Sequence, residues 1–494
     1  MQEEEGRIVE IDADVAADLS CHPPLVVDLD GTLLRTDLLS ESGLRLIKQS
    51  PWAIIFIPLW LLRGRAYLKR KIFNLARPDI ALLPIHEELL AWLRGQKELG
   101  RRLVLATASD QKLAELAVAP MELFDVVIGS DGERNLKGRA KLETIVRLCG
   151  PVFDYAGNSH ADHPVWRSSR EAILVNASKS VEAAARRTSP VTRVFERKGT
   201  TLGATIRSLR LYQWVKNLLI FVPAFTSHQA VYWAVLYKLA ITFLAFGLCA
   251  SGVYVCNDLL DLEEDRRHRT KKNRPFATGQ VQIRTGVIVS AISLSLGLGL
   301  SAVIGEMLLP LVLLYVGLTT CYSLYLKRIL LVDVLILAVL YTIRLIVGHA
   351  VTGIPYSVWL SSFAFFLFLS LAFSKRAAEL VTLAGNGRDV LPGRGYAAVD
   401  LNMATTAGVC SGFLSVLVLA LYINSDAVRI LYYRPAILWA ILPLLLYYIL
   451  RLWVICGRGE LHDDPVIYTA KSPSTYFVAI IVVLIVIAAT VKSF

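Results

Sequence analysis

The sequence predicts a multidomain protein in which an α/β domain with a parallel sheet precedes an all-α bundle of about nine transmembrane helices. Short apolar runs alternate with helical stretches in the first part of the chain, a pattern typical of buried parallel strands. Long apolar segments follow, and 55% of the 494 residues are hydrophobic, which excludes an ordinary soluble protein. We therefore expect an α/β domain at 1–180, a linker at 181–204 and a membrane domain at 205–494.

Charge and cysteine content exclude several classes of protein. The net charge is +11, but the basic residues cluster beside apolar segments and form no dedicated arm, so nucleic acid is not the expected partner. The seven cysteines form no CxxC pair, which argues against structural zinc and a disulfide framework. The acidic start MQEEEGRIVEIDAD has no apolar stretch, so we expect no signal peptide and a cytoplasmic N-terminus.

The first domain is expected to contain five buried strands and a helical insertion. The strands are expected at 25–30, 102–108, 125–129, 152–157 and 172–177. The insertion, at about 37–86, contains the apolar run PWAIIFIPLWLL (51–62) and then RGRAYLKRK, and the run is too short to span a bilayer. Two interpretations stay open: an interfacial helix resting on anionic headgroups, or an ordinary cap helix packed on the core.

Nine candidate spans follow, and the distribution of basic residues predicts their orientation. The spans are expected near 211–227, 231–256, 285–304, 307–325, 331–350, 356–374, 404–423, 435–456 and 475–492, the first being the weakest. Most basic loop residues then lie on the side of the N-terminal domain. The sequence thus predicts a multi-pass protein of the plasma or inner membrane, with the N-terminal domain and the active sites in the cytoplasm.

An acidic cluster stands where the second span ends. Its members, in the run NDLLDLEED, are Asn257, Asp258, Asp261 and Asp265. At helical spacing these side chains point into an arc of about 100°. Oxygen ligands that converge in this way suit Mg²⁺ bridging to a substrate diphosphate. The alternative is a solvated acidic helix end, but carboxylates beside hydrocarbon are costly unless they are paired or bind a metal.

This run matches in full the NDxxDxxxD motif of the UbiA-type superfamily of intramembrane prenyltransferases, which the bundle resembles over about 205–494. The basic KKNRPFATG (271–279) resembles a further segment of that family. QWVKN (213–217), the Arg344/Gly348 spacing and SKRAAEL (374–380) look most like the branch that makes polyprenyl-phosphate phosphoribose. That resemblance implies phosphoribosyl diphosphate as donor, a polyprenyl phosphate as acceptor and Mg²⁺ as cofactor. The family's second acidic site often reads DxxxD, whereas this chain has Tyr396 and Asp400 there.

Cationic groups are expected to bind the two anionic substrates, because an ionised acceptor phosphate needs no strong general base. The candidate substrate-binding residues are Lys216, Asn217, Lys271, Arg274, Arg344, Lys375, Arg376, Tyr396 and Asp400. Arg344 lies well inside an apolar span, where an ionisable residue is a functional candidate. The alternative interpretation is that Arg344 forms a structural pair with a neighbour such as Tyr341. For Lys375 and Arg376 the alternative interpretation is that they are charges flanking a span, which set its topology.

The N-terminal domain carries a second candidate chemistry. LVVDLDGT places Asp28 and Asp30 at the carboxyl end of a strand, where open α/β sheets bind ligands. The motif resembles that of the haloacid dehalogenase superfamily, and further elements of the family pattern follow in order at Thr107, Lys137 and GNSHAD (157–162).

That resemblance implies that Asp28 attacks phosphorus and that Asp30 acts as acid and then base. Thr107 and Lys137 would hold the phosphoryl oxygens, and Mg²⁺ would be supported by Asp28, Asp162 and the main-chain carbonyl of Asp30. Asn158 stands in the metal site where the family usually has an acid, which should weaken Mg²⁺ binding.

The sequence therefore predicts a bifunctional membrane enzyme. The bundle transfers 5-phosphoribose to a polyprenyl phosphate, and the fused domain removes the 5-phosphate from the product. One rival is an aromatic prenyltransferase that uses a prenyl diphosphate. The other is an active transferase whose dehalogenase-like domain is catalytically silent and only docks or regulates. The sequence predicts neither the prenyl chain length nor the oligomeric state.

Overall fold

The computed structural model describes residues 22–491 apart from 197–200, 386, 388, 392, 462–464, 466–467 and 470–471. The chain forms two compact units. The first comprises Met1–Ser208 together with Asp258–Val287, and the second comprises Leu209–Asn257 together with Ile288–Phe494. The expected division at a single linker therefore differs from the structure, because a segment between two spans belongs to the first unit.

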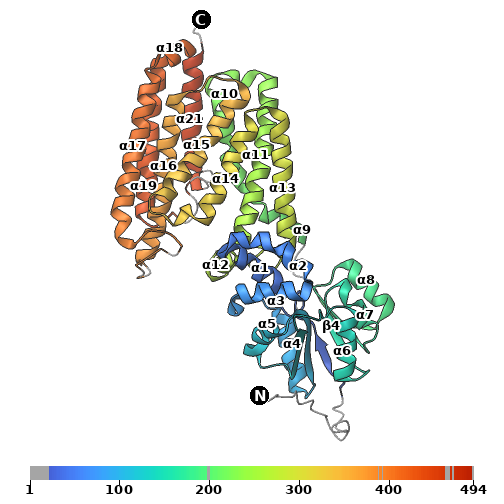
Figure 1. Cartoon of the computed structure of the whole chain (residues 1–494). Coiled ribbons are helices and arrows are strands. Elements are labelled where there is room, and N and C mark those ends of the chain that lie inside the picture. Colours follow the sequence, from blue (N-terminus) through green and yellow to red (C-terminus); the bar gives the residue numbers. More distant parts are fainter. Residues whose placement is uncertain are drawn as a thin grey trace, which may run out of the picture. The chain divides into compact units, whose positions relative to one another are not determined.

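A six-stranded parallel sheet forms the centre of the first unit, which confirms the predicted α/β class (Figure 1). The strand order is β3-β2-β1-β4-β5-β6. The strands are β1 Leu25–Val27, β2 Leu103–Asp110, β3 Val126–Ser130, β4 Asp154–Gly157, β5 Ala172–Val175 and β6 Val191–Phe195. The five short apolar runs of the sequence thus form strands, all buried between helices as the lack of alternation predicts.

Helices cover both faces of this sheet. Buried residues of α4 Glu87–Glu98 and α5 Gln111–Val118 share one core cluster with the strands. Buried residues of α6 Arg139–Cys149, α7 His163–Trp166 and α8 Lys179–Thr188 share the other. The carboxyl ends of β1, β2 and β4 therefore meet at one edge, where ligands bind in sheets of this kind.

The described residues of the linker expected at 181–204 instead include a helix and a strand of the sheet domain. They contribute α8 and the edge strand β6, and α9 Thr201–Ser208 follows. Val181 and Ala185, four residues apart, are buried in the core, and so is Phe195. The charged residues between these buried positions face outward, and for this reason the composition of the segment is that of a linker.

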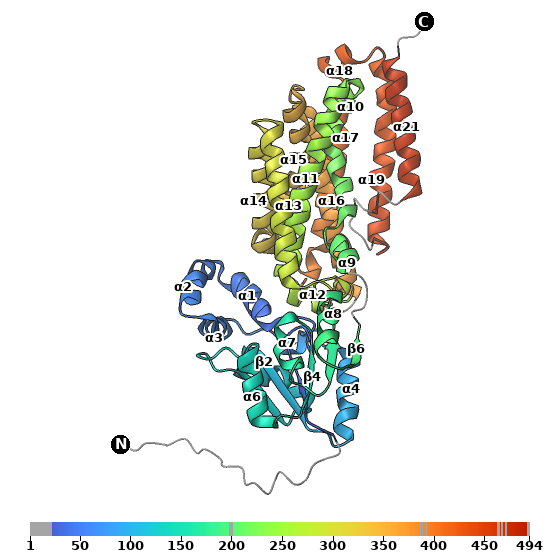
Figure 2. The same ribbon diagram turned by 90° about the vertical axis from the view of Figure 1, so that its right-hand side faces the viewer.

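The insertion between β1 and α4 is helical. It contains α1 Leu38–Gln49, the 3₁₀ helix η2 Pro51–Phe56, α2 Ile57–Leu62, α3 Arg65–Leu75 and the 3₁₀ helix η3 Ile80–Leu82. A small core of its own holds these helices together, formed by Leu46, Ala53, Leu68, Ile72 and Ala76. Figure 2 shows α1, α2 and α3 as a separate group beside the strands.

The second unit is a helical bundle. Among the described residues, seven helices are long and apolar enough to cross a bilayer. They are α11 Trp233–Leu260, α13 Ile283–Ile304, α15 Val332–Thr352, α16 Val358–Gly385, the span Ala398–Ile423 that contains α17 Leu401–Ile423, the span Pro435–Gly457 that contains α19 Ile441–Gly457, and α21 Pro473–Thr490. Some of these residues, at the ends of α11 and α13, belong to the first unit.

The expected count of nine spans is not confirmed. The segment 211–227 forms the 3₁₀ helix η6 Leu211–Phe221 and the short α10 Val222–Thr226, with Pro223 near the junction. The segment 307–325 forms α14 Leu308–Leu324, which is apolar but only 17 residues long. A helix needs about 20 residues to cross the hydrocarbon layer.

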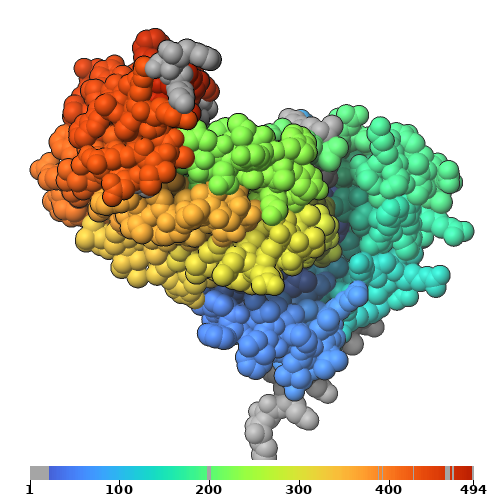
Figure 3. All heavy atoms as spheres, turned by 90° about the horizontal axis from the view of Figure 1, so that it is seen from above, coloured from blue at the N-terminus to red at the C-terminus, as the bar shows by residue number. Residues whose placement is uncertain are grey.

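Small residues allow close packing within the bundle. A Cβ atom on Gly408 of α17 would come within 2.2 Å of the Trp453 ring, and one on Gly348 of α15 within 2.3 Å of the Ile220 carbonyl oxygen. Helix interfaces in membranes commonly depend on such residues. Seen from above in Figure 3, the first segment of the bundle (green) lies next to the C-terminal segment (red), where the rings of His228 and Tyr432 are 5.0 Å apart.

A buried ion pair joins the insertion to the acidic motif within the first unit. Arg266, in α12 Leu262–Arg267, donates to both carboxylate oxygens of Glu41, at 2.6 and 3.1 Å. The Thr36 hydroxyl donates to the same carboxylate at 2.6 Å. Both side chains are less than 10% exposed. Removing one partner of such a pair leaves an uncompensated buried charge.

Glu41→Ala is expected to destabilise the first unit by about 3–5 kcal/mol, because Arg266 loses its buried counter-ion. Thermal unfolding of the detergent-solubilised chain measures this loss of stability, and hydrogen exchange of the sheet amides locates it in the first unit. The matched control is Glu143→Ala, which breaks an exposed pair with Arg134 and should cost at most about 1 kcal/mol. Equal effects of the two substitutions would contradict the assignment.

Candidate functional site

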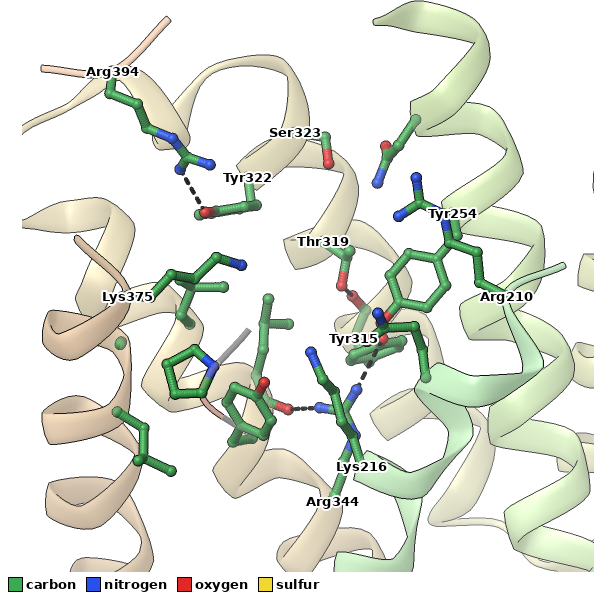
Figure 4. Close-up of a pocket in the computed structure, with 18 residues that line it drawn as sticks. Arg210, Lys216, Tyr254, Tyr315, Thr319, Tyr322, Ser323, Arg344, Lys375 and Arg394 are labelled. Carbon is green, nitrogen blue, oxygen red and sulfur yellow. Dashed lines mark hydrogen bonds between the residues drawn. The ribbon is translucent and has the colours of Figure 1, made fainter. Parts of the chain in front are cut away.

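A cavity of about 210 Å³ opens within the second unit (Figure 4). Five of its lining residues are cationic: Arg210, Lys216, Arg344, Lys375 and Arg394. Among the described residues that line it, none is an aspartate or a glutamate. Tyrosines contribute further polar groups from α11, α14 and α15. The lining therefore has the charge of a site for anions.

Arg344 is the most deeply placed of these cations. It lies in α15 with 3% of its surface exposed, and its Nε donates to Asn217 Oδ1 at 2.9 Å. Its Nη2 donates to the Tyr315 hydroxyl at 3.2 Å, and the Tyr341 ring lies 5.5 Å from the guanidinium. Among the described residues no acid forms an ion pair with Arg344. These neutral partners orient the guanidinium without neutralising it, which leaves its charge for a ligand.

Lys216 and Lys375 reach the same space from other elements. Lys216 is buried in η6, and its Nζ lies 5.4 Å from the centre of the Tyr341 ring. Lys375 belongs to α16. Figure 4 shows the ends of both side chains and the Arg344 guanidinium directed toward one another across the cavity. The structure thus brings together three of the predicted substrate-binding cations, with Asn217 as a hydrogen-bond partner behind them.

Arg394 was missed by the sequence analysis. It lies in the connection between α16 and α17 and donates to the Tyr322 hydroxyl at 2.8 Å. The neighbouring Gly395 fits closely, because a Cβ atom there would lie 2.7 Å from the Arg328 carbonyl oxygen. The sequence GRG at 393–395 was the available signal: flanking glycines let a backbone approach closely and present one long cation.

Arg376, Tyr396 and Asp400, predicted to bind substrate, do not line the cavity. Arg376 is fully buried with its Nε 2.8 Å from Asp333 Oδ2. The Tyr396 hydroxyl donates to Asp333 Oδ1 at 2.7 Å. Asp400 accepts a hydrogen bond from the Ala397 amide at the start of α17. Their partners give all three a structural role, and Asp333 is the residue that sequence analysis failed to single out.

The acidic motif is shared between the two units. Asn257 lines the cavity, whereas Asp258, Asp261 and Asp265 belong to the first unit. Arg274 Nη1 lies 3.0 Å from Asp258 Oδ1 and 2.5 Å from Asp265 Oδ2. Burial raises the pKa of Asp265, and Arg274 opposes the rise.

Two of these carboxylates thus converge on one cationic nitrogen, which is the donor arrangement that a divalent cation also takes. Asp261 lies 3.6 Å from Lys48 Nζ, and Lys271 is exposed. In the described part of the chain no three acidic, histidine or cysteine side chains gather as a ready metal site. The residues fit Mg²⁺ in ligand type, with Arg274 as the cation that now holds them.

A second group of residues meets at the carboxyl edge of the sheet. Asp28 is buried after β1, and Lys141 Nζ of α6 lies 2.7 Å from its Oδ1. Burial raises the pKa of the Asp28 carboxyl to about 7, and the Lys141 ammonium opposes this rise. Lys137, the predicted partner, is exposed. Lys141 therefore takes the place expected for Lys137, because it lies on the buried side of α6 whereas Lys137 precedes the helix.

Asp30 lies in a network of donors. Its Oδ2 accepts from the Ser109 hydroxyl at 2.5 Å and from the Thr107 hydroxyl at 3.3 Å. Its Oδ1 accepts from the Leu38 amide at 2.9 Å. Burial, and next the Asp37 carboxylate, raise the pKa of Asp30. A carboxyl group that holds a proton more readily suits the acid and base role expected of Asp30, and Ser109 is a further residue that the sequence analysis missed.

Asp162 and Asn158 complete this group. Asp162 lies 3.8 Å from Lys141 and accepts from the Tyr155 hydroxyl at 2.8 Å. The Asn158 side chain packs against Gly31, where a Cβ atom would lie 2.0 Å from its Nδ2. Asp28 and Asp162 thus face the same ammonium, with the Asn158 amide beside the turn after Asp30. Two carboxylates and an amide are oxygen donors of the type that Mg²⁺ binds.

Comparison with known proteins places the membrane part in a family. Residues 218–468 match the UbiA prenyltransferase family, and the chain belongs to that family. It is therefore an integral membrane protein of the transferase class.

Several individual proteins are similar to this chain. The chain is 34% identical to an uncharacterized protein of Sinorhizobium fredii over 94% of this chain and 91% of that protein. It is also 34% identical to the decaprenyl-phosphate phosphoribosyltransferase of Corynebacterium glutamicum, over 36% of this chain and 54% of that protein. A solved UbiA homolog from Archaeoglobus fulgidus, bound to GPP and Mg²⁺, aligns with a TM-score of 0.44 and 18% identity, over 58% of this chain and 98% of its own.

Lys375→Gln is expected to weaken binding of inorganic diphosphate by about tenfold or more, because a charge-assisted contact to a phosphate contributes roughly 1.5–3 kcal/mol. Titration calorimetry of the detergent-solubilised chain with magnesium diphosphate measures the affinity of each variant. The matched control is Arg429→Gln, an exposed arginine that contacts Asp426 and Asn424. An unchanged affinity for diphosphate in Lys375→Gln would remove Lys375 from the anion site.

Proposed function

We propose that this protein transfers 5-phosphoribose from phosphoribosyl diphosphate to a polyprenyl phosphate. The observation that carries the proposal is the gathering of five cations, from separate elements of the bundle, in the described lining of one cavity. Both proposed substrates are anionic at the reacting end, and together they carry four phosphoryl groups. Burying several cations in a membrane bundle is costly unless anions compensate them.

The rival is transfer of a prenyl chain from a prenyl diphosphate to an aromatic acceptor. That reaction brings only one diphosphate into the site, and its acceptor carries no phosphate. The segment 374–380 also counts against it, since Lys375 lines the cavity. The Corynebacterium relative, a phosphoribosyltransferase by name, supports the phosphoribosyl donor for this chain too.

The reaction follows from the charges. A phosphate oxygen of the acceptor attacks C1 of the ribose, and the bond from C1 to the diphosphate breaks, so the diphosphate leaves with the electron pair. The acceptor is already ionised and needs no strong base. Lys216, Arg344 and Lys375 hold the anionic groups and stabilise charge on the departing diphosphate. Asp258 and Asp265 would hold Mg²⁺, which would supply Lewis-acid stabilisation of the leaving diphosphate.

The first unit is proposed to act on the product as a phosphatase of the haloacid dehalogenase type. Asp28 attacks the phosphorus of the 5-phosphate, and the ribosyl oxygen leaves with a proton from Asp30. Asp30 then takes a proton from water, which releases inorganic phosphate and restores Asp28. In this proposal Lys141 and Thr107 would hold the phosphoryl oxygens, and Asp28 and Asp162 would hold Mg²⁺. Both active sites are proposed to face the cytoplasm, at the plasma or inner membrane.

The transferase step is tested with purified protein, Mg²⁺, labelled phosphoribosyl diphosphate and polyprenyl phosphate, with mass analysis of the lipid extract. Asp258→Asn is expected to lower the rate of lipid formation by about 100-fold or more, since a metal ligand is lost. The control is Glu264→Gln, an exposed neighbour that pairs with Lys48, and it should retain the rate. If prenylated hydroxybenzoate forms from a prenyl diphosphate and no ribosyl lipid forms, the protein is an aromatic prenyltransferase.

Asp28→Asn is expected to leave phosphoribosyl transfer intact and to make the 5-phosphorylated lipid accumulate, because only the second step needs a nucleophilic carboxylate. Mass analysis distinguishes the two lipids by one phosphoryl group. The control is Asp125→Asn, which alters an exposed pair with Lys97 away from this edge. The same phosphorylated product from wild type and Asp28→Asn would show a silent domain, and Asn158→Asp then tests whether a charged metal ligand restores dephosphorylation.

A further inference from the structure

The helical insertion of the first unit presents a continuous apolar surface. Within Pro51–Leu62, seven large apolar side chains are exposed: Trp52, Ile54, Ile55, Phe56, Leu59, Leu61 and Leu62. Trp52 is 77% exposed and Leu62 is 84% exposed. Single exposed apolar residues are ordinary, but seven along twelve residues form a patch of the kind that marks an interaction surface. We call these twelve residues the apolar strip.

The strip is exposed although the insertion already has a core. Ala53 is buried in that core, and Ile57 and Trp60 pack against it. Helix α2 has no fully buried residue. One side of the strip therefore holds it to the insertion, while the other side has no partner among the described residues of the insertion. The interpretation of the run as an ordinary cap helix accounts for the first side alone.

The sequence that flanks the strip carries charge of one sign, although Arg45 and Lys48 pair with Glu263 and Glu264 in the structure. No acidic residue occurs between Glu41 and Asp79, whereas eight basic residues do: Arg45, Lys48, Arg63, Arg65, Lys69, Arg70, Lys71 and Arg77. Arg63 and Arg65 follow the strip directly and are exposed. Apolar side chains beside such cations are the composition of a segment that lies in the interface of an anionic membrane.

We propose that the apolar strip and its two arginines dock on the surface of an anionic bilayer. The apolar side chains enter the boundary between headgroups and acyl chains, and Arg63 and Arg65 contact lipid phosphates. The bilayer is favoured over a second copy of the chain because two copies would bring their basic residues together. The chain's own spans keep it at a bilayer, so even weak docking is favoured by a high effective concentration. The proposal does not depend on the proposed function.

The full chain in lipid nanodiscs provides the test. A bimane fluorophore is attached at Ile55→Cys, in a background without other reactive cysteines, and at Leu99→Cys as the matched control. Leu99 is 66% exposed in the same unit and Ile55 is 68% exposed. Brominated lipids are expected to quench the label at 55 several-fold more than the label at 99, and iodide in the water is expected to quench it less.

Two results would overturn the proposal. Iodide quenching at 55 equal to that at 99 would mean that the strip stays in water. Protection from both iodide and brominated lipid would mean that protein covers it. The role of charge is tested with Arg63→Glu and Arg65→Glu together, which should reduce lipid quenching at 55 in anionic nanodiscs. Quenching that is the same in neutral and anionic nanodiscs, and unaffected by this change, would exclude an anionic surface as the partner.

Discussion

The cost of burying charge in a medium of low dielectric constant governs the membrane bundle. Asp333 and Arg376 meet this cost by pairing with each other, both fully buried. Arg344 meets it only in part, because its partners are an amide, a hydroxyl and aromatic rings. A cation held in place by neutral groups is stable only near anions. The cavity is therefore characterised by the cations that its lining gathers as much as by its shape.

The cost of burying charge also governs the first unit, where Glu41 pairs with Arg266. The short stretch from Asp30 to Glu41 connects the two candidate sites of the first unit, since the Leu38 amide binds Asp30 and the Glu41 carboxylate binds Arg266. Arg266, which directly follows the acidic motif, is thus bound to the helical insertion within the first unit. The second rival, in which the dehalogenase-like domain is catalytically silent, is compatible with the same contacts and differs from the active domain only in chemistry.

Much of this architecture followed from local patterns. The five apolar runs predicted as strands are strands of the sheet. Lys216, Arg344 and Lys375, selected from the sequence, line one cavity. The sequence analysis failed where the decisive information was spatial. The sequence of β6 resembles a charged linker because its Thr and Arg face outward. Lys141 lies on the buried face of α6, whereas Lys137 precedes that helix. Arg394 reaches the cavity from a connection whose path depends on Asp333. None of these contacts leaves a period or a spacing in the sequence.

The first unit is discontinuous in the chain, which has a consequence for its biosynthesis. Its sheet is complete at Phe195, yet its remaining part is Asp258–Val287, on the far side of the hydrophobic helix α11. A ribosome that adds about 5–20 residues per second needs several seconds to reach that part. During this interval the Glu41 carboxylate has no Arg266 to bind. The nascent domain must therefore wait for the insertion machinery to place α11 before it can reach its final fold, which makes membrane integration a step in the folding of a domain outside the bilayer.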